Sequence, residues 1–157
     1  MAAWSAVLEK DGQYHTFLGR VFDALEDRQR DYHFLLAGGE AYPETPDFQF
    51  FNQAPGWIPG EELTRMIRQE DFQWVWGALL AFSTSCSKEQ ILSGVRALYV
   101  PETSDQDSWH IRNRFLETGA EFMIYAEDST YTELLTRNRK LLELFCRHEP
   151  GAVVREL

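Results

Sequence analysis

The stretch "FQWVWGALLAFS", from Phe72 to Ser83, contains the longest apolar run of the chain, Trp74 to Phe82. This run is about half as long as a membrane-spanning helix requires. We therefore predict that it forms the central strand of a sheet inside a globular domain. We also expect Gly77 to let another backbone approach closely, because glycine has no side chain.

Further strands are predicted where apolar residues cluster between turn signals. The segment "DYHFLLAGG" (31–39) is apolar enough to be buried on both faces of a sheet, and it closes with a glycine pair. The other predicted strands are "WSAVLEK" (4–10), "FQFF" (48–51, pairing briefly at an edge), "VRALYV" (95–100), "EFMIYAED" (121–128) and "AVVREL" (152–157, a last edge strand).

Helices are predicted where apolar residues recur at helical spacing. One stripe runs from Tyr14 to Leu25, and "GEELTRMIRQ" (60–69) follows as a short helix with two acids in its first turn. A third helix runs through "SWHIRNRFLETG" (108–119), with Ser104 or Asp105 as its cap.

The segment 130–137 allows two interpretations. Thr130 and Glu133 have the spacing of a capping box, and an apolar stripe continues from Tyr131 to Phe145, so one long helix is favoured. Alternatively, Asp128 and Ser129 form a tight turn, "TYTELLT" pairs back as a strand, and the helix begins near Asn138. Both interpretations end in a helix that precedes the last strand.

Helices and strands alternate irregularly, without repeats, low-complexity tracts or a convincing linker. We therefore predict that residues 1–157 form a single α+β domain. Its core is one mixed, mostly antiparallel sheet, with about four helices packed on it.

The composition limits the class of partner. Of the 157 residues, 44% are hydrophobic and 14% aromatic, which is enough for one continuous core, and the formal net charge is -10. Such a charge repels phosphate backbones and anionic lipids, so we expect no nucleic-acid and no membrane partner. The cysteines, Cys86 and Cys146, are expected to be buried free thiols of a reducing compartment. The N-terminus lacks the basic start of a signal peptide, so a cytoplasmic location is expected.

The glycine pair Gly38-Gly39 is not a phosphate-binding loop. Such a loop leads directly into a helix, whereas Glu40 follows at once and places a negative charge where a phosphate would lie. We predict that the pair is a turn at the end of a strand. No other motif indicates a cofactor.

Motifs for catalysis or a metal are also absent. Asp105, Asp107 and His110 could share a metal or form a carboxylate–imidazole pair, but acids at a helix start are ordinary caps, so no metal is predicted. His33 lies in an apolar strand and is interpreted as a core histidine with its polar atoms satisfied. The absence of a nucleophile motif favours a protein that is not an enzyme.

The charge pattern is the feature that indicates a function. The sequence contains no Lys or Arg between Arg30 and Arg65, whereas acidic and aromatic residues accumulate there, many on a proline-rich loop. Aromatic residues surrounded by acids are typical of a surface that docks a basic protein. The predicted partner-binding residues are Glu40, Tyr42, Glu44, Asp47, Phe48, Phe50, Trp57, Glu61 and Glu62.

A smaller basic cluster near the other end of the chain is interpreted differently. It comprises Arg137, Arg139, Lys140 and Arg147, and we expect it to be the solvated face of the last helix.

The segments "FLG", "HFLLAGGEAY", "WVWGALLAF" and "RFLETGAEFMIYAEDS", taken in order, resemble a small bacterial family of uncharacterised cytoplasmic proteins, a domain of unknown function. The resemblance implies an α+β fold and no catalytic residues. In size, acidity and aromatic content the chain is also similar to immunity proteins that neutralise bacterial toxins.

The function that we predict is therefore non-enzymatic binding of a basic protein through this acidic, aromatic surface. The alternative is a small-molecule-binding domain or a hydrolase-type enzyme, with a pocket under the 42–60 loop that uses Glu40, Asp105, Asp107 or His110. A homodimer built across an exposed strand edge such as "AVVREL" is compatible with both functions.

Overall fold

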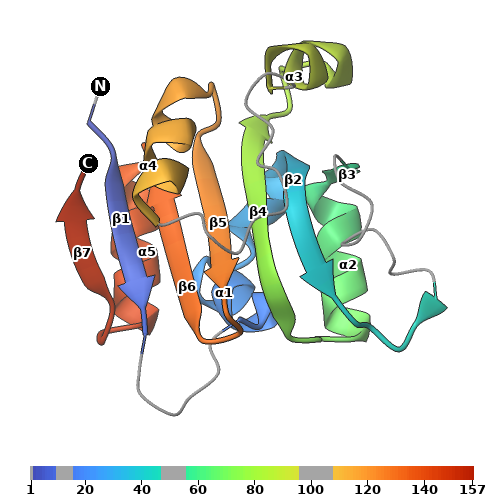
Figure 1. Cartoon of the computed structure of the whole chain (residues 1–157), viewed down its shortest axis with the longest axis horizontal. Coiled ribbons are helices and arrows are strands. Elements are labelled where there is room, and N and C mark those ends of the chain that lie inside the picture. Colours follow the sequence, from blue (N-terminus) through green and yellow to red (C-terminus); the bar gives the residue numbers. More distant parts are fainter. Residues whose placement is uncertain (1, 10–15, 47–55, 96–107) are drawn as a thin grey trace.

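A computed structural model of the chain describes residues 2–9, 16–46, 56–95 and 108–157 (Figure 1). Seven strands form one sheet in the order β3-β2-β4-β5-β6-β1-β7, and all their pairings are antiparallel. The predicted α+β class, with a single mostly antiparallel sheet, is confirmed. The strands are β1 (Trp4–Leu8), β2 (Tyr32–Ala41), β3 (Gly56–Pro59), β4 (Trp74–Ser83), β5 (Phe122–Glu127), β6 (Tyr131–Thr136) and β7 (Val153–Glu156).

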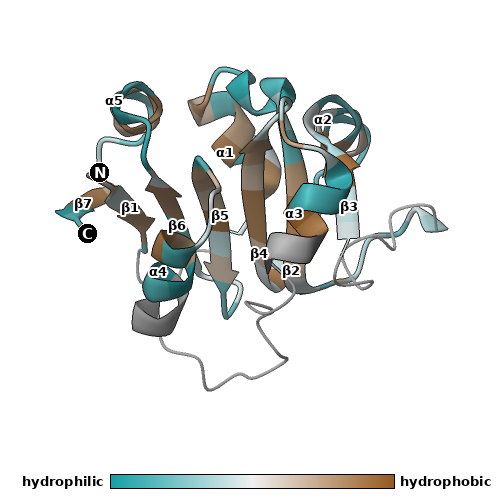
Figure 2. Ribbon diagram, turned by 90° about the horizontal axis from the view of Figure 1, so that it is seen from above, coloured by the Kyte–Doolittle hydropathy of each residue, from teal (hydrophilic) through white to brown (hydrophobic). Residues whose placement is uncertain are grey.

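Helices cover both faces of this sheet. Figure 2 shows α1, α2 and α5 on one face, and α3 and α4 on the other. The helices are α1 (Leu18–Ala24), α2 (Gly60–Gln69), α3 (Lys88–Val95), α4 (Ser108–Glu117) and α5 (Arg139–His148), with a short 3-10 helix, η1 (Arg28–Asp31), between α1 and β2.

The central strand β4 is apolar from Trp74 to Phe82 because most of its residues are buried on both faces. Leu79 and Ala81 belong to the core under α1, α2 and α5, whereas Leu80 and Phe82 belong to the core on the opposite face. Successive side chains of a strand point to opposite faces, so a strand between two helical layers needs apolar residues at every position. The prediction of a central strand from this run is confirmed.

The two predictions made for glycines on β2 and β4 are wrong. Gly38 and Gly39 do not form a turn: they continue β2, opposite Ala78 and Gly77, after a shift of register between Leu36 and Gly38. A bulge of this kind absorbs an extra residue, so the strand can pass through the glycines. At Gly77 the close neighbour is a side chain and not a backbone, since a Cβ there would lie 2.3 Å from the Trp74 indole.

The preference for one long helix after residue 130 is also wrong. Asp128 and Ser129 have φ values of 53° and 61°, and they lie in the three-residue connection, 128–130, that joins β5 to β6 as a hairpin. Two consecutive positive φ angles match the twist of paired strands, which explains why the hairpin forms in place of the capping box. Helix α5 then begins at Arg139, where the Asn138 side chain accepts hydrogen bonds from the N–H groups of Lys140 and Leu141.

Two further boundaries differ from the sequence-based prediction. Helix α1 begins at Leu18 because the preceding residue, Phe17, makes a β-bridge with Gln73. Val95, predicted to begin a strand, is the last residue of α3, and residues 96–100 of that predicted strand lie outside the described residues. The predicted segment 48–51 also lies outside them.

Cys86 and Cys146 are free thiols, as expected, and both are half-buried. Burial raises the pKa of the Cys146 thiol. Among the described residues, no helix combines the length and the apolar character that crossing a membrane requires.

Candidate functional site

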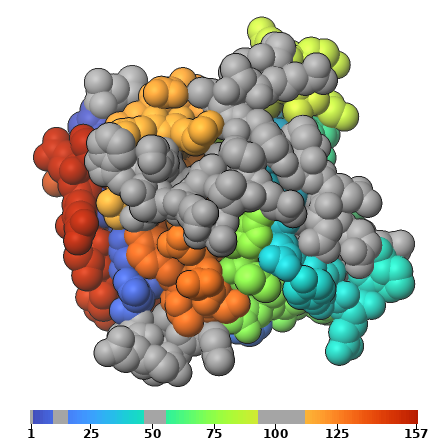
Figure 3. Space-filling model, in the orientation of Figure 1, coloured from blue at the N-terminus to red at the C-terminus, as the bar shows by residue number. Residues whose placement is uncertain are grey.

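The end of β2 and the residues after it project from the body of the molecule. We call residues Glu40–Pro46 the β2 arm; it stands out at the lower right of Figure 3, in cyan. Tyr42 on this arm is 73% exposed, the largest exposure of a large hydrophobic residue in the described part of the chain. Its hydroxyl donates a hydrogen bond to the Glu40 carboxylate, and this bond raises the pKa of Tyr42. The arm thus presents an aromatic ring beside a negative charge.

A carboxylate from α2's end holds the β2 arm in place. Glu70 accepts hydrogen bonds from the backbone N–H groups of Glu44 and Thr45, at 2.7 and 2.9 Å, and from the Thr45 hydroxyl at 2.5 Å. The Thr45 hydroxyl, followed by the Glu44 N–H, lowers the pKa of Glu70. Both the anchor and the arm therefore carry negative charge at neutral pH.

Glu61 and Glu62 lie at the opposite end of α2. Both are exposed in its first turn, and Glu62 forms an ion pair with Arg65 that lowers the pKa of the carboxyl group. Glu62 precedes Glu70 by eight residues, and the helical rise therefore separates their backbones by about 12 Å. These two acids extend the negative surface along α2 but do not touch the arm.

Trp57 lies on β3, where it pairs with Leu35. The ring is half-buried, with its centroid 4.9 Å from the His33 ring and 5.4 Å from the Lys88 ammonium group. Trp57 is therefore packed against other residues of the domain, whereas Tyr42 is mostly exposed. Asp47, Phe48 and Phe50, the remaining predicted binding residues, lie outside the described residues.

His33 does not have the satisfied polar atoms that we expected. Its Nδ1 atom and the Nε1 atom of Trp57 are both buried without a hydrogen-bond partner. The two rings lie against each other, tilted at 46° with 4.9 Å between their centroids.

The alternative site under the 42–60 loop is not assembled by the described residues. Asp105 and Asp107 lie outside them, and His110 belongs to α4 but its side chain is not described. Within the described residues, no group of three or more His, Cys, Asp or Glu side chains could hold a metal ion. This alternative therefore stays a prediction.

A buried ion pair under α4 was missed by the sequence analysis. Glu133 on β6 is fully buried, and it accepts hydrogen bonds from the Arg112 guanidinium at 2.8 Å and the Tyr131 hydroxyl at 2.7 Å. Burial acts to lower the pKa of Arg112, but the hydrogen bond and the charge of Glu133 outweigh it and leave this pKa raised. Since both oxygens of Glu133 are occupied, the pair serves to fasten α4 to the sheet.

Burial also raises the pKa of two residues near this ion pair, Tyr125 and Glu127. Tyr125, directly opposite Glu133 on β5, has a strongly raised pKa, chiefly because it is buried. The pKa of Glu127 is raised by burial and by neighbouring carboxylates, against a hydrogen bond from Tyr125. In a strand, Tyr131 and Glu133 point to the same face of the sheet. The sequence would therefore have indicated this polar row only if the segment had been interpreted as a strand.

The basic cluster of the sequence analysis is divided by the structure. Arg137 precedes α5, and its guanidinium donates hydrogen bonds to the carbonyl groups of Phe115, Leu116 and Ala120 at the end of α4. It is therefore a cap for α4 and not part of the solvated face of α5. Arg139 pairs with Glu143 on the exposed side of α5.

The chain matches no protein-family model, no curated protein and no solved structure. The resemblance to a small bacterial family therefore stays a prediction. The function has to be inferred from the surface of the molecule itself.

Proposed function

We propose that the protein binds a basic region of another protein through the β2 arm, and that it acts by binding and not by catalysis. The observation that carries this proposal is Tyr42, which is 73% exposed on an anchored arm. Exposed tyrosines at rigid positions are frequent anchors of protein interfaces, since they bury a large area at a small cost in side-chain entropy.

The negative charges around Tyr42 favour a partner with a positively charged surface. Glu40 and Glu44 lie on the arm, Glu70 binds the arm from the end of α2, and neither Lys nor Arg occurs between Arg30 and Arg65. Such a surface accelerates association with a cationic partner and disfavours an anionic one. The exposed acids Glu61 and Glu62 on α2 would extend the same field.

The anchoring by Glu70 supports binding in a second way. Because the arm is already held by three hydrogen bonds, it loses little conformational entropy when a partner docks. A preformed acidic surface of this kind also agrees with the similarity in size and charge to immunity proteins that neutralise toxins.

Site-specific photo-crosslinking tests the proposal. We would replace Tyr42 with the photoreactive analogue p-benzoylphenylalanine, irradiate cells that express the variant, and identify the crosslinked proteins. The control places the same group at Val153, which is 55% exposed on β7. We expect a crosslinked protein of basic character from position 42 that does not appear from position 153.

Charge reversal then tests the electrostatic part. Glu44→Lys combined with Glu61→Lys should reduce the yield of that crosslink, and added salt should reduce the wild-type yield in the same direction. The proposal is wrong if position 42 gives the same products as position 153, or if reversal of both charges leaves the yield unchanged.

A further inference from the structure

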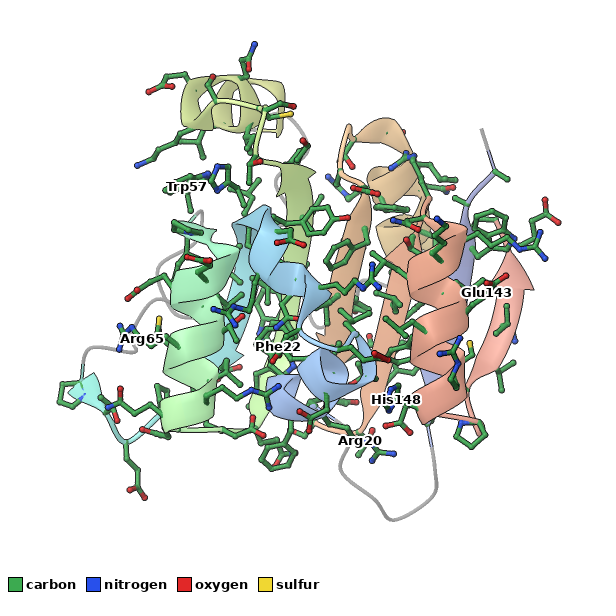
Figure 4. The ribbon with its side chains drawn as sticks, turned by 180° about the vertical axis from the view of Figure 1, so that it is seen from behind. Arg20, Phe22, Trp57, Arg65, Glu143 and His148 are labelled. Carbon is green, nitrogen blue, oxygen red and sulfur yellow. The ribbon has the colours of Figure 1, made fainter. Side chains whose placement is uncertain are left out.

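A hollow between η1 and α5 has a chemistry opposite to that of the β2 arm. It lies on the face of the sheet that carries α1, α2 and α5, and it encloses about 330 Å³. Figure 4 shows this side of the molecule and labels Glu143 and His148 on α5. The hollow is lined by Glu26, Arg28, Asp31, Tyr32, Asn138, Lys140, Leu141, Glu143, Leu144 and Arg147.

Three cations line this hollow without an ion-pair partner. Most other arginines in the described part of the chain are neutralised: Arg20 by Glu149, Arg68 by Asp23 and Asp27, and Arg112 by Glu133. Arg28, Lys140 and Arg147 form no ion pair with any described residue. All three are exposed, and they lie together in one hollow although the chain as a whole carries a formal net charge of -10.

The acids of the same hollow are largely engaged elsewhere. Glu143 pairs with Arg139 at 3.2 Å, and Glu26 lies 3.3 Å from the His148 ring nitrogen. Asp31 is the one acidic lining residue without such a contact among the described residues. Only Glu143 is paired with an arginine, so the three cations face two acids, Glu26 and Asp31, and a small excess of positive charge remains for a ligand.

The spacing of the cations indicates the size of the ligand. Lys140 and Arg147 lie seven residues apart on one stripe of α5, which corresponds to about 10 Å along the helix. Leu141 and Leu144 supply apolar contacts between them. Lys140 also lies in the first turn of α5, where the helix dipole favours an anion and opposes a cation.

The floor of the hollow is polar and fixed. Tyr32 is hydrogen-bonded to Glu121, and the Asn138 amide donates to the same carboxylate at 2.9 Å. The Tyr32 ring packs edge-on against Phe122, at 4.9 Å between centroids. These contacts hold the walls of the hollow in place, and none of them involves Arg28, Lys140 or Arg147.

We propose that this hollow binds a small molecule that carries two anionic groups, either phosphates or carboxylates, which are placed between Arg28, Lys140 and Arg147. The volume corresponds to about ten water molecules, which suits a ligand of metabolite size. This site is separate from the β2 arm, so its failure would leave the proposed docking function unaffected.

Titration with two probes tests the proposal: inorganic pyrophosphate for a phosphate ligand and succinate for a dicarboxylate. Each would be added to the full chain at constant ionic strength, and binding followed by backbone amide NMR and by calorimetry. We expect saturable shifts at Leu141 and Leu144 with at least one probe, and the probe that binds more tightly assigns the ligand class. If neither probe gives a saturable shift there at millimolar concentration, the proposal is wrong.

Charge variants separate a specific site from a general field. Lys140→Gln and Arg147→Gln should each weaken binding by about tenfold, which is the effect of losing one charge-assisted hydrogen bond. Asp31→Asn should tighten binding by about two- to fivefold, because it removes an unpaired negative charge.

The matched control is Arg155→Gln. It makes the same charge change at an exposed position of β7, outside the lining of the hollow, and Arg155 forms no ion pair with any described residue. It should alter binding by less than about twofold, given the weak effect of an exposed charge. Thermal unfolding would confirm that every variant is folded. Equal losses for Arg155→Gln and Lys140→Gln would overturn the proposal in favour of non-specific attraction.

Discussion

The two faces of the sheet bury different kinds of side chain. Under α1, α2 and α5 the core is a continuous apolar cluster that includes Phe22, Phe34 and Phe145. The face under α4 has a smaller apolar cluster and also buries Glu133, the one charged residue that is buried in the described part of the chain. Stability on the first face depends on many small contacts, whereas on the second face it depends strongly on one ion pair.

The largest effect is expected on the apolar face. Phe22 of α1 is fully buried and points into the core in Figure 4. Phe22→Ala should lower the free energy of unfolding by about 4 kcal/mol, because it removes buried apolar surface and leaves a cavity. Urea denaturation would measure this loss. Phe22→Leu, which preserves most of the volume, should cost about half as much or less.

The ion pair under α4 should come next. Glu133→Ala leaves the Arg112 guanidinium without its partner, and we expect a loss of about 3 kcal/mol in the same measurement. The matched control is Glu143→Ala, which breaks an exposed ion pair of α5 and should cost a few tenths of a kcal/mol.

The double variant Arg112→Met, Glu133→Leu would sharpen the comparison. If the packing of buried volume is what stabilises the face under α4, the two apolar residues should restore most of the stability that is lost in Glu133→Ala. If instead the double variant is as unstable as the single one, the ion pair contributes more than the avoidance of an unpaired charge.

The start of α5 should show an intermediate effect. Asn138→Ala removes the side chain that caps two N–H groups and that also donates to Glu121, so a loss of about 1 kcal/mol is expected. Asn138→Asp retains the oxygen that caps α5 but loses the amide donor. Its free energy of unfolding should therefore lie between those of the wild type and Asn138→Ala. A loss for Asn138→Asp equal to that for Asn138→Ala would show that the bond to Glu121 dominates.

The smallest effect is expected at the edge of the polar row under α4. Burial raises the pKa of Glu127 above its ordinary value of 4.5, so the ionised carboxylate is the form that the fold disfavours. The wild-type protein is therefore relatively more stable below pH 4.5 and loses that contribution as the pH rises through the raised pKa. At pH 7, Glu127→Gln should be more stable than the wild type by a few tenths of a kcal/mol, after allowance for solvent screening.

Chemical denaturation of Glu127→Gln and the wild type over a series of pH values would check this difference. The difference should grow from pH 4 towards neutrality. If Glu127→Gln is less stable than the wild type at pH 7, the hydrogen bond with Tyr125 outweighs the effect of burial.

Local patterns in the sequence were sufficient for much of the fold. The run from Trp74 to Phe82 predicted a central strand because burial on both faces leaves no polar positions. The helix at 60–69 was predicted with its observed bounds, since its apolar stripe and its acidic first turn agree. In both segments the signal lies within about ten residues of chain.

The features that were missed depend on partners far away in the sequence. Gly38 and Gly39 continue a strand because β4 offers Ala78 and Gly77 opposite them. The hairpin at Asp128 and Ser129 competes with a capping box that the local sequence favours, and only the pairing of β6 with β5 decides between them.

The same limit applies to the candidate sites. The charge pattern indicated Tyr42 and Glu44, but not that Glu70 anchors the arm. The lining of the hollow combines residue 28 with residues 140 and 147, which no local pattern connects. Sequence patterns therefore predicted which residues are candidates, whereas only the fold shows which of them meet.

The position of β1 has a consequence for biosynthesis. This first strand lies between β6 and β7, and the backbone N–H of Leu157 donates to the carbonyl of Ala3. On a ribosome that adds about 5 to 20 residues per second, the two neighbours of β1 emerge roughly 6 to 30 seconds after it, because about 130 to 150 residues separate them from β1. The strand β1 must therefore stay unpaired for that time, and a chaperone that shields "WSAVL" would be expected to raise the yield of folded protein.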